Sequence, residues 1–215
     1  MFLNRGDRLA IVDFEDRKIN YTELVNNVKY FSENVIPAEK EDFGLILMEN
    51  RPEWIYTYFA LWDRKAIPIA LDSTSSSKEI LYVLGDSDPK FVICSNESEK
   101  NVREAVSMYE KGEITVINVD NHPIDENKLE VIRNSNFELG NPEGDSIATM
   151  LYTSGTTGSP KGVMLTFNNL SSELEGLEKK DLLEPTDQIL ALLPFHHVLP
   201  LTATVLIILQ HQASM

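Results

Sequence analysis

Hydroxyl, glycine and lysine residues are concentrated between positions 153 and 162. The run reads Thr-Ser-Gly-Thr-Thr-Gly-Ser-Pro-Lys-Gly and follows an apolar segment, Ser146 to Tyr152. Hydroxyls and backbone amides are donors suited to phosphate oxygens, and glycine lets a ligand approach the backbone closely. A lysine adds a point charge that can meet a terminal phosphate. The composition of this loop therefore indicates a phosphate-binding site.

The spacing within the loop excludes two common phosphate motifs. A P-loop needs a glycine, four residues and then Gly-Lys-Ser/Thr, whereas here Gly155 is followed by Gly158, and Lys161 by Gly162. No Gly-x-Gly-x-x-Gly run is present to support a dinucleotide site. The remaining alternative is a flexible polar surface loop, and the strand-to-loop context with its terminal Pro-Lys-Gly argues against it.

Two adjacent histidines, His196 and His197, are the second chemical candidate. From residue type alone, a histidine between Phe195 and Val198 is more often structural than functional. With His211 the pair suggests a metal site, but no nearby cysteine or carboxylate completes a zinc ligand set. We therefore predict no metal site from these residues.

The charge balance is strongly acidic, with 34 Asp and Glu residues against 19 Lys and Arg and a net charge of −15. No basic stripe is present, so we expect no nucleic-acid partner. ATP can still bind, because salt screens charges beyond about 8 Å and the loop concentrates donors nearby.

Cysteine content and hydropathy indicate the setting of the protein. Cys94 is the single cysteine and lies in an apolar run, which predicts a buried thiol in a reducing, cytoplasmic environment. The most apolar segment, Val198 to Leu209, is shorter than the roughly 20 residues that span a bilayer. We expect no transmembrane segment, and peripheral membrane contact stays open.

The elements that must position these residues alternate between helix and strand. Apolar spacing predicts helices and strands in turn from residue 24 onward, with strands over residues 43–48, 67–71, 91–94, 114–119 and 146–152. Ser76 and Glu79 form a capping box for one helix, which Gly85 is expected to end. Residues 120–145 are polar and irregular. The alternation indicates an α/β fold, a mainly parallel sheet flanked by helices in one domain.

The run from Tyr152 to Val163 resembles the signature of the adenylate-forming superfamily, which includes acyl-CoA synthetases, luciferases and the adenylation domains of peptide synthetases. Three further segments agree in order and spacing, namely 19–24, 48–71 and 193–197. The resemblance is greatest toward acyl-CoA synthetases and long-chain fatty acid:CoA ligases. It implies that residues 1–215 are the N-terminal portion of the large AMP-binding domain, an α/β unit that is incomplete here.

The resemblance also implies a reaction. A carboxylate attacks the α-phosphate of ATP to give an acyl-adenylate and pyrophosphate, and coenzyme A then takes the acyl group, with Mg²⁺ offsetting phosphate charge. It gives catalytic roles to Lys161 and to His197, which would line the acyl pocket, and leaves His196 structural. Cofactor binding falls to seven residues of the loop: Thr153, Ser154, Gly155, Thr156, Thr157, Gly158 and Lys161.

The chain departs from the family pattern in places. Lys65 stands where a glycine is common, and the family's later Thr-Glu pair, ribose-binding aspartate and final lysine do not occur. We therefore expect the 215 residues alone to be inactive. The resemblance implies a fatty acid as the carboxylic acid substrate. Two alternatives remain, an adenylation domain that loads a carrier protein and a non-catalytic nucleotide-binding module.

Overall fold

A six-stranded sheet forms the centre of the computed structural model, which describes residues 3–140, 143–153, 160–180 and 183–215. The strand order is β6-β5-β3-β4-β7-β8, and all neighbours are parallel except β7 and β8, which are antiparallel. The strands are β3 (Phe43–Leu47), β4 (Ile67–Leu71), β5 (Phe91–Cys94), β6 (Thr115–Asn118), β7 (Ile147–Thr153) and β8 (Lys161–Thr166). The mainly parallel sheet expected from the sequence is confirmed.

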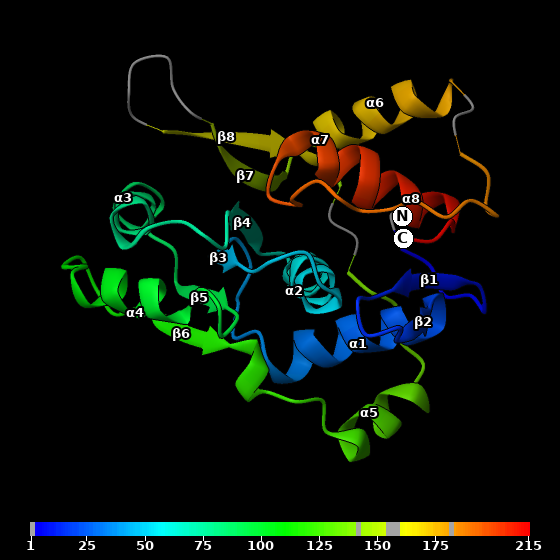
Figure 1. Ribbon diagram of the computed structural model, residues 1–215, viewed down its shortest axis with the longest axis horizontal. Coiled ribbons are helices and arrows are strands. Elements are labelled where there is room, and N and C mark those ends of the chain that lie inside the picture. Colours follow the sequence, from blue (N-terminus) through cyan, green and yellow to red (C-terminus); the bar gives the residue numbers. More distant parts are fainter. Residues whose placement is uncertain (1–2, 141–142, 154–159, 181–182) are drawn as a thin grey trace.

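Helices cover both faces of this sheet. In Figure 1, α3 and α4 lie on one side, and α1 and α2 lie on the other. The longer helices are α1 (Tyr21–Asn34), α2 (Pro52–Asp63), α3 (Ser77–Ser87), α4 (Glu99–Ser107), α5 (Glu126–Arg133) and α6 (Phe167–Glu178). α5 packs on α1 and contains Leu129 to Ile132, the apolar part of the otherwise polar stretch 120–145.

Alternation along the strands divides the buried side chains between two cores. Leu45 and Val92 belong to the core beneath α3 and α4, whereas Ile46 and Ile93 belong to the core beneath α1 and α2. Successive side chains of a strand point to opposite faces, so apolar residues at every position require cover on both sides. Cys94 lies in the first core, as predicted, and burial raises the pKa of its thiol to about 12.

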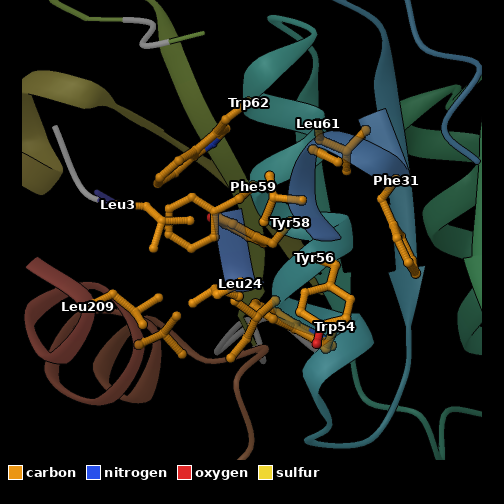
Figure 2. Close-up of a cluster of buried hydrophobic side chains, with 14 of the residues drawn as sticks. Leu3, Leu24, Phe31, Trp54, Tyr56, Tyr58, Phe59, Leu61, Trp62 and Leu209 are labelled. Atoms are coloured by element: carbon orange, nitrogen blue, oxygen red, sulfur yellow. The ribbon is translucent and has the colours of Figure 1, made fainter. Parts of the chain in front are cut away.

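Helix α2 is buried almost all round. Pro52 occupies its first turn, where a missing N–H costs no helical bond. Every residue from Trp54 to Trp62 is buried, and Figure 2 shows these aromatic side chains packed against Leu3, Leu24 and Leu209 from other segments. The Trp62 indole donates to the Ala148 carbonyl at 2.7 Å. Both tryptophans are core residues, as expected.

The two ends of the chain meet at a small hairpin. It consists of β1 (Leu9–Val12) and β2 (Lys18–Asn20), and the amide of Val12 donates to the carbonyl of Met215 at 2.8 Å. The final helical run comprises α7 (Val198–Pro200), a π-helical segment (Leu201–Leu206) and α8 (Ile207–His211). Across the described residues, no helix is both long and apolar enough to cross a membrane.

Two local predictions need correction. The capping box of Ser76 and Glu79 is confirmed, but Gly85 does not end α3. The helix continues to Ser87 because Asp88 adopts the left-handed conformation that terminates it, at φ 47°. Strand β8 and helix α6 had no predicted counterpart, because β8 is an exposed edge strand without a continuous apolar pattern.

The backbone of Lys65 shows how one departure from the family pattern is accommodated. It has φ 59°, in the region that favours glycine, at the turn between α2 and β4. The turn is kept, with a lysine held in the conformation that glycine adopts at no steric cost.

Candidate nucleotide-binding site

The direction of chain winding reverses between β3 and β4. From β3 the chain passes through α2 on one face to β4, and from β4 it passes through α3 on the other face to β5, which lies beyond β3. In open α/β sheets, ligands bind outside the carboxyl ends of the strands at such a switch point. The topology therefore marks the carboxyl edge beside Leu47 and Leu71 as the place for a site.

A cleft of about 720 Å³ lies at this edge. Its walls come from the turn after β1, the segments that follow β3 and β4, and the segment 191–196. The lining includes Asp13, Phe14, Arg17, Met48, Glu49, Asn50, Arg51, Pro52, Asp72, Ser73, Thr74, Pro194 and His196. Charges of both signs and apolar groups meet in one hollow, as in a small-molecule site.

The ends of the glycine-rich loop are held together at the same edge. Thr153 ends β7, Lys161 begins β8, and the two are partners across the antiparallel pair, both exposed. Ser154, Gly155, Thr156, Thr157 and Gly158 lie outside the described residues. The donors that the structure does place, a hydroxyl and an ammonium, have the chemistry that phosphate oxygens require.

The register of β4 and β7 relates this loop to the cleft. Ala70 pairs with Leu151 in parallel register, so the carboxyl ends of β4 and β7 lie at the same edge of the sheet. Asp72, which directly follows β4 and lines the cleft, therefore lies at the same edge as Thr153, where β7 leads into the loop. The structure thus brings Thr153 and Lys161, which the sequence predicts as site residues, to the same edge of the sheet as Asp72, which it does not predict.

Helix α3 fixes both arms of the hairpin that carries the loop. The Tyr152 hydroxyl donates to Asp86 at 2.7 Å, and the Tyr82 hydroxyl donates to the carbonyl of Pro160 at 2.9 Å. Burial and the Asp86 bond raise the pKa of Tyr152 above its ordinary value, so this tyrosine stays a donor. Tyr82 and Asp86 are four residues apart and share a helix face.

The two histidines are placed differently. His196 lines the cleft with 11% of its side chain exposed, and its Nε2 atom lies 3.9 Å from Oδ2 of Asp72. His197 is exposed at the start of α7, with its ring centroid 4.1 Å from that of His196. Burial and then His197 lower the pKa of His196, while Asp72 opposes the shift. Within the described residues, the histidine interpreted as structural is the one that faces the cleft.

Asp72 was missed in the sequence. Burial raises its pKa, but hydrogen bonds from the Thr74 amide and hydroxyl and the electrostatic effect of the two histidines lower it overall, so the carboxylate is charged at neutral pH. The available signal was its position, because a polar Asp-Ser-Thr run directly after a buried parallel strand lies at the carboxyl edge.

Arg51 is a second residue that sequence reasoning missed. Its guanidinium lies 3.1 Å from Glu49, 2.8 Å from Glu53 and 2.8 Å from Asp120, and 24% of the side chain is exposed. Glu49 also accepts a 2.7 Å bond from the Ser95 hydroxyl. This network ties the segments after β3, β5 and β6 together, so it fixes the back of the cleft.

A resident metal has no evident ligand set in the described part of the chain. Among those residues, no group of three or more His, Cys, Asp or Glu side chains is arranged to hold an ion. We therefore assign no magnesium ligands and derive no step through the metal.

The fold is a doubly wound α/β architecture with a cleft beside the carboxyl ends of its strands. Residues 3–215 match the family model described as AMP-binding enzyme. Because the match covers nearly the whole chain, the protein belongs to this family.

Relatives of the chain are ligases that act with coenzyme A. The chain is 30% identical over 205 residues to 2-succinylbenzoate–CoA ligase of Bacillus subtilis, which covers 92% of the chain and 38% of that protein. It is 34% identical over 143 residues to fatty acyl-CoA synthetase A of Dictyostelium discoideum, covering 59% of the chain and 21% of that protein. The chain therefore spans well under half the length of these relatives.

Solved structures agree with the fold. ATP-bound MatB from Rhodopseudomonas palustris superposes with a TM-score of 0.80 at 25% identity, over 99% of the chain and 42% of MatB. O-succinylbenzoate coenzyme A synthetase from Bacillus subtilis, in complex with ATP and a magnesium ion, gives 0.75 at 25% identity, over 97% of the chain and 53% of that protein.

Proposed function

We propose that this chain forms the ATP-binding edge of a ligase that joins a carboxylic acid to coenzyme A through an acyl-adenylate. The observation that carries the proposal is the pairing of Thr153 with Lys161 across β7 and β8, at the same edge of the sheet as Asp72 and the switch point. ATP, as a substrate, supplies the adenylyl group that joins the carboxylate, and pyrophosphate leaves. The chain's own part is to position the phosphates and to offset their charge.

Each described residue has a separate task in this proposal. The Lys161 ammonium binds a terminal phosphate oxygen, and the Thr153 hydroxyl donates to a neighbouring oxygen. The remaining loop residues, Ser154 to Gly158, supply further donors by resemblance to the family. The histidine pair contacts the acid, and either His197, which the family pattern selects, or His196, which faces the cleft, makes that contact.

The substrate class and the setting complete the proposal. We propose a fatty acid as the acid, with Mg²⁺ and coenzyme A as the remaining participants, in a cytoplasmic protein of fatty acid metabolism. The named relatives support this choice in part, because they include fatty acyl-CoA, long-chain and 2-succinylbenzoate ligases. We further propose that ATP binding, and not turnover, is the activity of these 215 residues by themselves.

Calorimetric titration with ATP tests the nucleotide site. We expect Lys161→Met to weaken ATP binding about tenfold, or ~1.4 kcal/mol, because it removes the placed positive charge. Lys128→Met, an exposed lysine of α5 on another part of the molecule, is the matched control and should leave the affinity unchanged. Equal affinities for wild type and Lys161→Met would remove Lys161 from the site.

Pyrophosphate release tests the chemistry with a panel of fatty acids, 2-succinylbenzoate and sulfoacetate. ATP binding without release from the 215 residues is the expected result. Acid-dependent release by these residues would overturn the restriction to binding and would name the acid directly. Failure to bind ATP at all would contradict the proposed function.

A further inference from the structure

Both polar atoms of the Asn50 side-chain amide form hydrogen bonds with one backbone segment that is distant in the sequence. Its Nδ2 atom donates to the carbonyls of Ala191 at 3.2 Å and Leu193 at 2.9 Å, and its Oδ1 atom accepts from the amide of Phe195 at 3.0 Å. A primary amide has two N–H donors and one carbonyl acceptor, and all three groups are engaged here. The contacts join alternate residues of a segment more than 140 positions away.

The segment that Asn50 holds has little packing of its own. Leu190, Leu192 and Leu193 are 74%, 76% and 53% exposed, so these side chains contribute little burial energy. Phe195 is the buried residue of the run, and its ring packs edge-on against Trp54 at 5.3 Å between centroids. Both attachments, the amide and the indole, come from the β3–α2 connection and the first turn of α2.

The anchor itself is rigid. On one side of Asn50, Glu49 accepts from the Ser95 hydroxyl at 2.7 Å, and on the other, Arg51 pairs with Asp120 at 2.8 Å. The residues flanking Asn50 are therefore tied to β5 and β6. Because its neighbours are fixed to the sheet, the Asn50 side chain holds the 191–195 segment at a defined position relative to the sheet.

His196 follows directly after the held segment. It lies across the cleft edge from Asp72, with Nε2 and Oδ2 3.9 Å apart, and the cleft is lined by Asn50 and Asp72 as well as by His196. We propose that Asn50 is a positioning residue. It sets the distance between His196 and Asp72, which face each other across the edge of the cleft, and so the geometry of the acid-binding site. The role of that site rests on the proposed function above.

Hydrogen exchange at the Phe195 amide tests the clamp without relying on activity. Asn50→Leu keeps the side-chain size and removes all three bonds, so we expect this amide, which donates to Oδ1 of Asn50, to exchange about tenfold faster. Asn50→Asp keeps an acceptor for the Phe195 amide, so protection at that amide should return while the carbonyl bonds remain lost. Asn101→Leu is the matched control, because it removes one amide bond to the Ser75 carbonyl elsewhere. If Asn50→Leu does not fold, Asn50→Ser gives the same comparison.

Titration of the His196 ring by NMR separates positioning from plain stabilisation. In the native cleft the ring faces Asp72, His197 and the charged lining residues Glu49 and Arg51. In Asn50→Leu the midpoint should rise toward the ordinary histidine value as burial is lost, whereas Asn101→Leu should leave it unchanged.

The results separate the two proposals. An unchanged His196 titration and unchanged exchange in a folded Asn50 variant would overturn the clamp. A wild-type chain that binds no ATP would contradict the proposed function and leave the clamp measurements valid.

Discussion

The two parts of the site are built in contrasting ways. The carboxyl edge of β3, β4 and β5 rests on strands buried on both faces and is joined by the Arg51 network and the Asn50 amide. The β7–β8 hairpin ends in an exposed edge strand, with Val163 and Met164 43% and 52% exposed, and two tyrosine bonds attach it to α3. Under the proposed function, the first part would be a fixed wall for the acid and the second a lightly attached arm for the phosphates.

Among β3, β4 and β5, a substitution at Gly44 should lower the free energy of unfolding most. A Cβ atom there would lie 2.5 Å from the Phe91 ring and 3.0 Å from Leu61, and both are fully buried. We expect Gly44→Ala to lower the free energy of unfolding by about 3 kcal/mol, as overpacking does in a dense core. Denaturant unfolding measures this change in the free energy of unfolding.

The control for this change lies in α3. A Cβ at Gly85 meets nothing within 4 Å, and the residue sits inside a helix. Gly85→Ala should therefore raise the free energy of unfolding by about 0.5–1 kcal/mol. Equal losses at the two glycines would show that the sheet is not the tightly packed region.

Removing the Arg51 guanidinium should be the next largest effect. Arg51→Ala removes the cation beside Glu49 and Asp120 and leaves Glu53 paired with Arg17, and we expect a loss of about 2 kcal/mol in the free energy of unfolding. Arg133→Ala is the control, because its partners Glu126 and Glu130 are exposed and such pairs contribute under about 0.5 kcal/mol. A loss for Arg51→Ala no larger than that of the control would mean that the network does not stabilise the edge.

Changes to the β7–β8 hairpin should lower the affinity for ATP more than they lower the stability of the fold. Tyr152→Phe removes the bond to Asp86, and we expect ATP to bind about threefold more weakly because the end of β7 must then be fixed on binding. Tyr109→Phe removes a similar tyrosine–aspartate bond, to Asp88 at the C-cap of α3, in which the hairpin takes no part, and should leave the affinity unchanged. Identical titration curves for both variants would show that α3 does not hold the arm in the bound state.

The smallest effect should come from the capping box of α3. The Ser76 amide and hydroxyl donate to Glu79, which lowers the pKa of that carboxyl. A depressed pKa in the folded state means that this stabilisation is present above the ordinary glutamate value and is lost as pH falls through the folded value. Glu79→Ala should cost about 0.5 kcal/mol at pH 7 and almost nothing near pH 3. A cost that does not change with pH would indicate that the charge of Glu79 plays no part.

Much of the fold followed from local pattern. Apolar runs such as Phe91 to Cys94 required a sheet covered on both faces, and Pro52 with Glu53 and Trp54 marked the start of a buried helix. Strand β8 was not predicted, because an exposed edge strand has no buried face to impose a pattern. The end of α3 was misplaced because a left-handed Asp88 can replace the glycine that usually terminates a helix.

By itself, the sequence determined the donor types of the loop and the α/β class, because residue types and apolar periodicity are local properties. The tertiary structure decided which residues share the edge with that loop. Asp72, Arg51 and Asn50 gained their places from strand order and register, which depend on pairings between distant segments. The choice of His196 over His197 as the cleft residue depended on how one backbone segment is held, and contacts across 140 residues leave no periodic trace in the chain.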